Sequence, residues 1–452
     1  MGGKLRVAIN AQIRPGGSAG GIETVLHALA ALGRLDDGPE EYVFVGPHDE
    51  PDWLRASLGG ARGCVVVRGP LKSPRVKPDP GPLEPLKRAL GPLRPAAYEL
   101  KRRALSRSRG ARDDVPASDG FYEGLKCDVI HFPFQDFVRC ALPSVYNPHD
   151  LQHLHFPQFF TRDEIRRRES VYPAACRAAH TVVAASRFVK QDVVSRYRIP
   201  ADKVQVIPWA PPPAGADADE TGDAARAPRE KYGLGEEAFA LYPAMTWEHK
   251  NHLRLLEALA LLRDRDGVRV RLVCTGHQND FWPRVERRLD ELGLRDQVKF
   301  LGLVPRADLR ALYRAAGFVI VPTLFEAASA PLFEAWQHGA AVACSSVTSL
   351  PEQARDAALF FDPLSVESVA GAAARMAADA ALREDLRRRG RERLSDFSLE
   401  RTAKAYRAVY RRAAGRALGE EDRWLLSYNW SRAGENDATP IQHTRTGVHS
   451  YT

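Results

Sequence analysis

Short apolar runs alternate with amphipathic segments along most of the chain. In the first half, runs of mainly β-branched and apolar residues predict buried strands at residues 5–10, 42–45, 64–67, 128–132, 144–146, 181–185 and 204–207. Helical spacing lies between them, at residues 22–35, 163–179 and 188–197. Strands that alternate with helices predict a parallel sheet that is covered on both faces.

The second half repeats this alternation more regularly. Strands are predicted at residues 239–242, 269–275, 298–301, 318–322 and 342–345, and helices at residues 253–263, 282–292, 307–316, 331–338 and 399–417. We therefore expect an α/β protein with two Rossmann-like, doubly wound domains. Ligands of such sheets bind outside the carboxyl ends of the strands, so the predicted site is a cleft between the domains.

The domain boundary is predicted at residues 211–230, whose sequence PPPAGADADETGDAARAPRE lacks periodic apolar positions and is typical of an exposed linker. On either side lie an N-terminal domain at 1–210 and a second domain at 231–397, lengths that suit single α/β domains. The helix within 398–418 is expected to cross back to the first domain. The polar tail at 419–452 is expected to be poorly ordered.

The net charge of +8 is concentrated in one segment. Residues 71–114 hold twelve basic and five acidic residues, within a Pro- and Arg-rich stretch at 71–120 that interrupts the strand and helix pattern and is interpreted as an insertion. It is either a solvated loop or a surface that docks on an anionic membrane face, where each Lys or Arg adds about 1 kcal/mol. No nucleic-acid partner is expected, because Tyr98 is its only aromatic residue for stacking on bases.

The six cysteines are spread singly, which favours a reducing compartment and no structural metal. The chain begins with a polar start and lacks the long apolar core of a signal peptide, and no apolar run approaches about 18 residues. We expect a cytoplasmic protein. If residues 71–120 are the docking surface rather than a solvated loop, the protein is peripheral at the inner membrane face.

Two glutamates eight residues apart, Glu326 and Glu334, are the strongest local signal. Glu326 follows the strand predicted at 318–322, and Glu334 lies one turn into a helix whose first turn suits Pro331. Free amides at a helix start form an anion site, and a nearby carboxylate can accept hydrogen bonds from sugar hydroxyls. A nucleoside diphosphate sugar presents both groups. As isolated residues, the same glutamates also fit a favourable dipole contact and a solvated helix position.

Lys250 and His149 follow predicted strands at 239–242 and 144–146, which places both at the cleft. Charge builds on the leaving phosphate as a glycosidic bond breaks, so a fixed ammonium there stabilises the transition state more than the ground state. The imidazole of His149 can hydrogen-bond a transferred sugar. An exposed loop lysine and a structural histidine are the ordinary alternatives.

The segment at 322–363, PTLFEAASAPLFEAWQHGAAVACSSVTSLPEQARDAALFFDP, resembles the donor-binding signature of the family 4 glycosyltransferases, retaining enzymes with the GT-B fold. Further matches follow in the family's order: Gly20-Gly21-Ile22-Glu23, Pro148-His149-Asp150, Ala185-Ser186, the Lys250 loop at 242–252, Thr275-Gly276 and Gly302. The resemblance implies the GT-B fold and a nucleotide-sugar donor.

The resemblance also implies a role for each matching residue. Glu326 would contact the donor sugar, Lys250 the diphosphate and Glu334 the ribose, with His149 near the reacting carbon. Further donor contacts are implied for Ala328, Ser329, Ala330, Thr275 and Gly276. Asp150 is implied to orient the His149 loop, and Gly20, Gly21 and Glu23 to form an acceptor- or phosphate-binding loop.

Two departures from the family pattern concern the phosphate site. Family members commonly carry an Arg five or six residues before the Lys, where this chain has Met245 and Ala244. His249, His252 and Arg254 are the candidates to replace it. The glycines usual between the two glutamates are Ala327, Ala328 and Ser329, so a close approach to phosphate needs unusual backbone angles or a different loop path.

No metal or other cofactor is expected besides the donor substrate. The D-x-D sequences at 217–219 and 264–266 do not follow predicted strands. His153 and His155 lie close to His149 in sequence, but no carboxylate or cysteine is clearly placed with the three as a metal site.

We therefore expect a retaining transferase that moves a hexose to a glycan or lipid-linked acceptor during surface polysaccharide assembly. The loop at 242–252 resembles mannosyl-transferring members, which makes GDP-mannose the first donor to consider. A Rossmann-type NAD-dependent oxidoreductase and a catalytically silent GT-B protein are the alternatives. The sequence does not fix the donor base and sugar, the acceptor and its linkage, or the oligomeric state.

Overall fold

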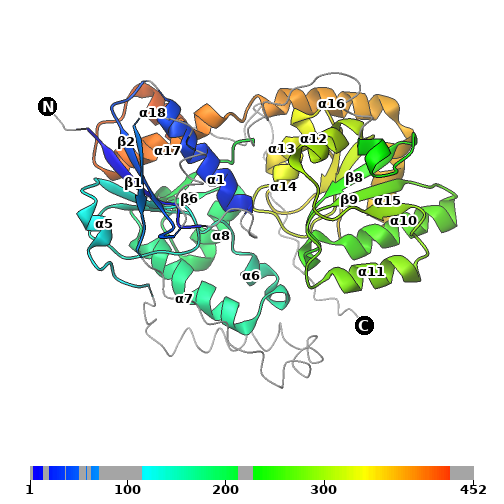
Figure 1. Cartoon of the computed structure of the whole chain (residues 1–452), viewed down its shortest axis with the longest axis horizontal. Coiled ribbons are helices and arrows are strands. Elements are labelled where there is room, and N and C mark those ends of the chain that lie inside the picture. Colours follow the sequence, from blue (N-terminus) through cyan, green and yellow to red (C-terminus); the bar gives the residue numbers. More distant parts are fainter. Residues whose placement is uncertain are drawn as a thin grey trace.

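The computed structural model of the chain describes residues 4–13, 20–35, 37–49, 58, 63–70, 115–211 and 228–427. Within these residues, two parallel sheets with their surrounding helices lie side by side (Figure 1). The predicted α/β fold with two Rossmann-like, doubly wound sheets is thereby confirmed.

The first sheet has seven parallel strands in the order β3-β2-β1-β4-β5-β6-β7. Its strands are β1 (Arg6–Asn10), β2 (Glu41–Gly46), β3 (Cys64–Arg68), β4 (Val129–Phe132), β5 (Ser144–Tyr146), β6 (Thr181–Ala184) and β7 (Val204–Val206). In β1, Val7 and Ile9 pack into one apolar core and Ala8 into another. Because both faces are buried, the strands appear in the sequence as continuous apolar runs.

The second sheet has six parallel strands in the order β10-β9-β8-β11-β12-β13. Its strands are β8 (Phe239–Pro243), β9 (Arg271–Thr275), β10 (Val298–Phe300), β11 (Phe318–Val321), β12 (Val342–Ser345) and β13 (Leu359–Phe361). We did not predict β13, whose three residues are too few for a periodic pattern. In each sheet the strand order reverses beside the first strand, between β1 and β4 and between β8 and β11, where a ligand crevice is expected.

Helices connect the strands of both sheets. Those of the first are α1 (Gly20–Ala30), η1 (Ala31–Arg34), α5 (Phe121–Gly124), α6 (Gln152–His155), η3 (Pro157–Phe159), α7 (Arg162–Ala178), α8 (Arg187–Tyr197) and η4 (Ala201–Lys203). Those of the second are η5 (Glu248–Lys250), α10 (His252–Asp266), α11 (Trp282–Glu291), α12 (Arg306–Ala315), α13 (Ala330–Gln337), α14 (Leu350–Ala354), α15 (Val366–Ala378) and α16 (Ala380–Leu394). Side chains fix several helix starts: Thr161 and Glu164 form a capping box at α7, and Ser186 caps α8.

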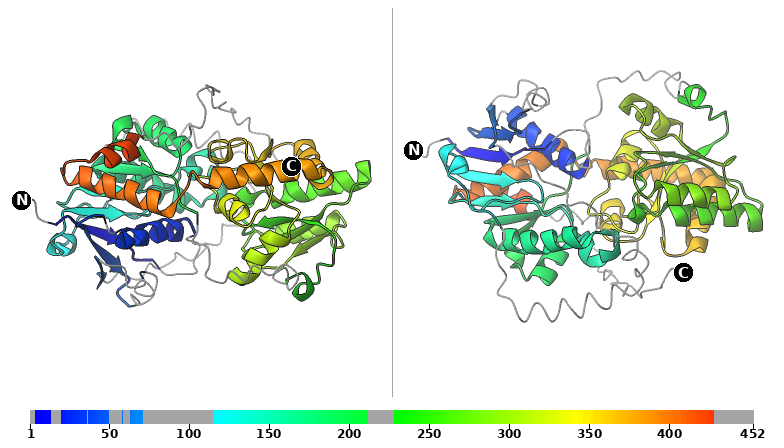
Figure 2. Two further views of the ribbon diagram at one scale, coloured as in Figure 1. Left: turned by 90° about the horizontal axis from the view of Figure 1, so that it is seen from above. Right: turned by 60° about the horizontal axis from the view of Figure 1, so that its bottom comes forward.

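The last long helix, α17 (Leu399–Ala413), packs on the first sheet after the second sheet is complete (Figures 1 and 2). Its buried face includes Tyr406, Val409 and Tyr410, which share an apolar core with Val7 and Ile9 of β1. The helix thus joins the end of the chain to the sheet that begins it.

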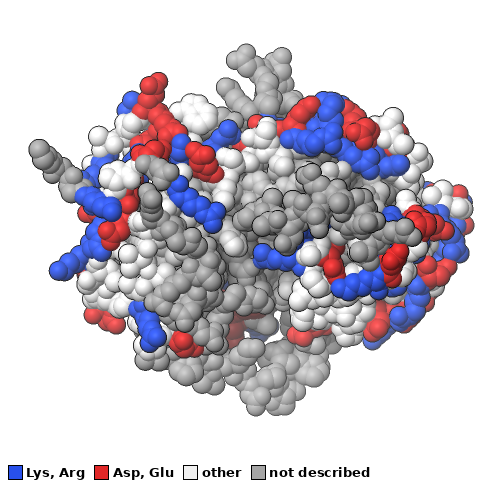
Figure 3. Space-filling view, turned by 45° about the horizontal axis from the view of Figure 1, so that its top comes forward, with Lys and Arg blue, Asp and Glu red and all other residues white. Residues whose placement is uncertain are grey.

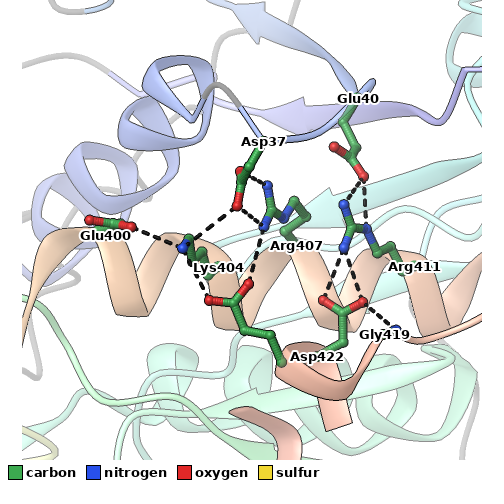
Figure 4. Close-up of polar contacts among 9 residues, drawn as sticks. Asp37, Glu40, Glu400, Lys404, Arg407, Arg411, Gly419 and Asp422 are labelled. Carbon is green, nitrogen blue, oxygen red and sulfur yellow. Dashed lines mark hydrogen bonds and ion pairs between the residues drawn. The ribbon is translucent and has the colours of Figure 1, made fainter. Parts of the chain in front are cut away.

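An ion-pair cluster fastens α17 to the loop before β2 (Figure 4). The side chain of Arg407 is 2% exposed and donates two hydrogen bonds to Asp37. Arg411 bridges Glu40 and Asp422, and Asp422 belongs to α18 (Glu420–Ser427). This helix occupies the residues where we expected a poorly ordered tail to begin, and the buried Asp422 anchors it to α17.

Several predicted segments lie largely outside the described residues: 71–114 of the insertion, 212–227 of the linker and 428–452 of the tail. On the face shown in Figure 3, Lys and Arg side chains are interspersed with Asp and Glu. Among the helices that the structure describes, none is long and apolar enough to cross a bilayer. The role of the basic insertion stays a prediction.

Candidate active site

A cleft with a volume of about 970 Å³ lies between the two sheets. Loops that follow β4 and β5 line it from the first sheet, and loops that follow β8 and β11 line it from the second. The volume lies at the upper end of the range for small-molecule sites. Seven of the predicted site residues line this cleft: His149, Asp150, Lys250, Glu326, Ala328, Ala330 and Glu334.

Lys250 and Glu326 form an ion pair in the cleft. Lys250 Nζ lies 2.6 Å from Glu326 Oε1, and the two side chains are 20% and 11% exposed. Asn251 follows Lys250 with a φ of 63° and donates its side-chain amide to backbone carbonyls in the segments that follow β11 and β13. Leu324 N donates to His249 O at 2.8 Å. The loops after β8 and β11 are therefore one unit that presents a cation beside a carboxylate.

Glu334 faces the same cleft from α13. The Tyr313 hydroxyl donates a hydrogen bond to Glu334 Oε2 at 2.6 Å. Burial raises the pKa of the Glu334 carboxyl above its ordinary value, while the Tyr313 hydrogen bond and the charge of Arg306 oppose that rise. The Tyr313 bond thus occupies one oxygen of this carboxylate, Oε2.

The loop between the two glutamates is regular although it lacks glycine. Ala327, Ala328 and Ser329 are not among the described non-glycine residues that have a positive φ. Of the two routes to a close approach without glycine, unusual backbone angles or a different loop path, these residues do not use the first. Ser329 N donates to Gln353 Oε1 at 2.8 Å, which leaves the first-turn amides of α13 as the donors for an anion.

His149 occupies a strained turn after β5. Its φ is 64°, and Asp150 N donates to Pro148 O at 2.9 Å, which closes a γ-turn. His149 Nε2 lies 2.7 Å from Pro133 O. Because a carbonyl oxygen only accepts, Nε2 carries the proton and Nδ1 remains an acceptor. Burial lowers the pKa of this imidazole, which favours its neutral form. Residues with a strained backbone of this kind cluster at functional sites.

Two family descriptions match successive parts of the chain: Glycosyltransferase Family 4 over residues 19–210 and Glycosyl transferases group 1 over residues 226–393. The O-antigen chain mannosyltransferase B of Escherichia coli is 30% identical over 295 residues, which are 61% of this chain and 75% of that protein. The chain belongs to the family 4 (group 1) glycosyltransferases. Its donor is therefore a nucleotide sugar, and the NAD-dependent oxidoreductase alternative is excluded.

Other relatives of this family 4 glycosyltransferase extend the comparison. The serotype-specific mannosyltransferase WbdA of Escherichia coli is 30% identical over 227 residues, which are 50% of this chain and 28% of that protein. A glycosyltransferase from Rickettsia africae has a TM-score of 0.61 at 16% identity, covering 92% of this chain and 100% of its own. Anabaena HepE in complex with UDP and glucose has a TM-score of 0.60 at 16% identity, covering 90% and 99%. These two structures support the GT-B fold.

A buried hydrogen-bond chain joins α17 of the glycosyltransferase to the loop that carries His149. The Tyr410 hydroxyl lies 2.7 Å from His131 Nδ1, and His131 Nε2 lies 2.9 Å from Asn147 Oδ1. Asn147 Nδ2 donates to the Tyr406 hydroxyl at 2.9 Å. Burial lowers the pKa of His131 to about 3, so this imidazole accepts from Tyr410 and donates to Asn147. Asn147 stands two residues before His149.

Thr275 and Gly276 support the Lys250 loop from behind. Ala244 N donates to Thr275 O at 2.8 Å. Gly276 has a φ of 125°, and a Cβ there would lie 2.6 Å from the carbonyl carbon of Ala244. Glycine is therefore required by close packing on this loop. Neither residue is among the described residues that line the cleft.

The predicted Gly-rich loop begins α1. Gly20, Gly21 and Glu23 form its first turn, and their side-chain positions lie outside the described residues. Thr24 and His27, on the following turn, line the cleft. Helix α1 therefore lines the cleft through these two residues.

The arginine that family members usually carry before the Lys has no replacement among the two nearby histidines. Burial lowers the pKa of His252 to about 3 and holds that of His249 well below its ordinary value, so neither is a cation at neutral pH. Arg254 donates to a backbone carbonyl after β13. Arg306 and Arg310 of α12 line the cleft instead. We did not predict them, because arginines on an amphipathic helix are usually solvent-exposed. The sequence does show that they are four residues apart at a helix start, which places them on one face of the helix.

His153 and His155 form two separate pairs with carboxylates. His153 Nε2 lies 2.9 Å from Glu169 Oε1, and His155 Nε2 lies 2.5 Å from Asp192 Oδ2. In the described ranges, no group of three or more His, Cys, Asp or Glu side chains is arranged to hold a metal ion. These two histidines therefore contact α7 and α8 through separate carboxylates.

Proposed function

We propose that this glycosyltransferase moves a hexose from a nucleoside diphosphate sugar to a hydroxyl of a glycan or lipid-linked acceptor, with retention of configuration, during surface polysaccharide assembly. The Lys250–Glu326 pair, 2.6 Å apart in a cleft that Glu334 and His149 also line, is the observation that carries the proposal. The cleft is thus lined by an ammonium group for the diphosphate, a carboxylate for sugar hydroxyls and a neutral imidazole that can accept a hydrogen bond.

Mannose is the proposed sugar and GDP-mannose the proposed donor. Two Escherichia coli relatives at 30% identity are named as mannosyltransferases, one of them for the O-antigen chain. The Lys250 loop at 242–252 also resembles mannosyl-transferring members. The UDP and glucose bound by Anabaena HepE carry less weight, because that protein is 16% identical to this chain.

In the proposed reaction, the acceptor oxygen attacks the anomeric carbon from the face that the leaving group departs. A bond forms between this oxygen and the anomeric carbon, and the bond from that carbon to the phosphate oxygen breaks. The electron pair of the broken bond goes to the phosphate oxygen, which also receives the acceptor's proton. The donor's own phosphate thus acts as the base, and no protein nucleophile is needed.

Each residue has a stated role in this proposal. Lys250 and the first-turn amides of α13 stabilise the charge that develops on the diphosphate. Glu326 accepts hydrogen bonds from sugar hydroxyls, and Glu334 Oε1 accepts them from the ribose. His149 Nδ1 accepts a hydrogen bond from a sugar hydroxyl near the reacting carbon. Arg306 adds positive potential beside Glu334, whose pKa it lowers.

The acceptor is proposed to bind the domain at residues 1–210. Its cleft wall includes Asp136, Glu164 and Arg167, a set of polar side chains that suits a polyhydroxylated ligand. Gly20, Gly21 and Glu23 would lie at the edge of this wall, and the basic insertion at 71–120 would hold the enzyme at the inner membrane face near a lipid-linked acceptor.

Ligand binding and turnover by the purified protein test the proposal. Saturation-transfer NMR with GDP, UDP and NAD should detect one nucleoside diphosphate, and its signal should weaken in Lys250→Ala and Glu334→Ala. Lys231→Ala is the matched control, because Lys231 pairs with Asp308 outside the cleft and is 55% exposed. Mannose should then pass from GDP-mannose to an acceptor or to water. Diphosphate binding without any transfer or hydrolysis would instead support the silent alternative.

A further inference from the structure

The segment after β12 holds the backbone of the donor loop at four points. Thr348 Oγ1 accepts a hydrogen bond from Glu326 N at 3.0 Å, and Ser349 Oγ donates to Glu326 O at 2.9 Å. Gln353 Oε1 accepts from Ser329 N at 2.8 Å, and Gln353 Nε2 donates to Ser329 O at 2.7 Å. All four bonds join side chains of residues 348–353 to backbone atoms, so they fix the path of the loop itself.

Thr348 makes its bond from a strained conformation. Its φ is 53°, a region that β-branched residues rarely adopt. Six non-glycine residues in the described part of the chain have a positive φ, and His149, Asn251 and Thr348 are three of them. All three lie in loops that carry or contact the proposed site residues. Strain of this kind persists only where the surrounding structure imposes it.

Gln353 is fixed from its other side by α16. Arg393 is 5% exposed and donates from Nε to Gln353 O at 2.8 Å and from Nη2 to Glu352 O at 3.0 Å. Gln353 N in turn donates to Ser349 O at 3.0 Å. Both polar atoms of the Gln353 side chain are hydrogen-bonded to Ser329, and its backbone is hydrogen-bonded to Arg393 of α16. Helix α14, which contains Gln353, therefore couples the position of α16 to that of the donor loop.

We propose that Thr348 and Gln353 are positioning residues that hold the glycine-free donor loop in its working geometry. Thr348 sets the position of Glu326, and Gln353 sets that of Ser329, the residue that precedes the first turn of α13. The inference rests on the proposed function, in which Glu326 contacts the sugar and the α13 amides contact the diphosphate. It accounts for the loss of the usual glycines, since side-chain hydrogen bonds supply the loop path.

Near-isosteric variants separate the two roles. Thr348→Val keeps the side-chain shape and removes the hydroxyl, so kcat should fall by about tenfold while the Kd for the nucleoside diphosphate changes by less than about threefold. Gln353→Leu should weaken that Kd by about tenfold, because the α13 amides lose their alignment. Thr348→Ser keeps the hydroxyl that Thr348→Val removes, so it should keep most of the kcat of the unmodified enzyme. The ligand is whichever of GDP and UDP binds the unmodified enzyme.

Gln297→Leu is the matched control for Gln353→Leu. Gln297 is 4% exposed, and its Nε2 donates to Val270 O at 2.9 Å, away from the cleft. This variant should lower the melting temperature without changing kcat or Kd. If Thr348→Val and Gln353→Leu, like Gln297→Leu, lower the melting temperature of an active enzyme without changing kcat or Kd, the two residues are only structural. The inference is then wrong, although the proposed function stands.

Hydrogen exchange keeps the inference testable if the proposed function fails. In that case the unmodified protein would neither bind a diphosphate nor transfer a sugar. Backbone amides at residues 325–332 should still exchange faster in Thr348→Val and Gln353→Leu than in the unmodified protein and in Gln297→Leu. Unchanged exchange in this peptide would overturn the positioning role whatever the activity.

Discussion

Lys250 Nζ lies 2.6 Å from Glu326 Oε1, although 76 positions separate the two residues in the chain. They meet because β8 and β11 are neighbours in the second sheet, so the loops at their carboxyl ends adjoin. The pair places opposite charges where the donor's diphosphate and sugar are proposed to meet. A diphosphate that binds Lys250 must share this ammonium with Glu326, so the two residues should act as one unit.

A double-mutant cycle tests this coupling. Lys250→Ala and Glu326→Gln should each lower kcat/KM by about a hundredfold, because each removes a charge that is aligned with the transition state. The double variant should lose much less than the product of the two single effects. The measurement is kcat/KM of the four proteins at one pH. Effects that simply multiply would mean that the ion pair is incidental to catalysis.

The raised pKa of the Glu334 carboxyl leads to a prediction of how donor affinity depends on pH. In the proposed ribose contact the ionised Glu334 carboxylate accepts the hydrogen bonds, and burial raises its pKa. Affinity should therefore be lost on acidification at a higher pH than for an ordinary glutamate. Tyr313→Phe removes the hydrogen bond that lowers this pKa, so the loss should move to still higher pH.

The measurement is the Kd of the nucleoside diphosphate between about pH 8 and about pH 5. Tyr232→Phe is the matched control, because the Tyr232 hydroxyl donates to the carboxylate of Asp308 outside the cleft. An acid limb that stays in place in Tyr313→Phe would show that Glu334 does not govern binding.

Glu352 predicts a pH-dependent contact between the two halves of the molecule. Its carboxylate accepts hydrogen bonds from Arg187 N at 2.7 Å and Phe188 N at 3.3 Å, at the start of α8. Burial raises its pKa to about 7, against the opposing effect of these bonds. A carboxyl whose pKa is raised by folding contributes stability at low pH that is lost as the pH rises through the folded-state value.

Glu352→Gln removes this titration while keeping an acceptor for one backbone amide. The melting temperature of the variant, relative to that of the unmodified enzyme, should therefore rise between about pH 5 and about pH 8. Glu237→Gln is the control, because Glu237 is 77% exposed and pairs with Arg271 at the surface. If the two melting curves stay parallel over this range, Glu352 does not titrate in the folded protein.

The sequence predicted the positions of the site loops but not their mutual arrangement. Lys250 and Glu326 were predicted because each follows an apolar run that had to be a buried strand. Their contact depends on strand order, which spacing along the chain does not contain. Strand β13 (Leu359–Phe361) was missed because three residues show no periodicity.

The supporting side chains were missed for a different reason. Tyr313 and Arg306 lie on an amphipathic helix, where polar residues are usually solvated. Thr348 and Gln353 act through hydrogen bonds to backbone atoms, which any Ser, Thr, Asn or Gln could make. Nothing in their local sequence distinguishes them, and only the fold shows which backbone lies within reach.

The hydrogen-bond chain from α17 to the His149 loop gives the last prediction. Tyr410→Phe leaves His131 Nδ1 without a donor in a core where His131 is fully buried. The loss should be about 1 to 3 kcal/mol of unfolding free energy, as expected for a buried polar group without a partner. Because His131 also holds Asn147, two residues before His149, kcat should fall by about tenfold as well.

Asp37→Asn separates an effect on the His149 loop from a general loosening of α17. Asp37 pairs with the buried Arg407 on the same helix, and this pairing lowers the Asp37 pKa to about 2. The pair therefore contributes its full stability at pH values above the pKa of an ordinary carboxyl group, and this stability is lost as the pH falls through the lowered pKa. Near neutral pH the loss of the pair should cost about 1 kcal/mol, the low end of the same range, because Asp37 is 46% exposed and solvent screens the pair. Urea unfolding and kcat of both variants are the measurements. Equal losses of stability with a fall in kcat only for Tyr410→Phe would show that α17 reaches His149 through the hydrogen-bond chain, whereas equal falls in kcat would mean that docking of the helix alone matters.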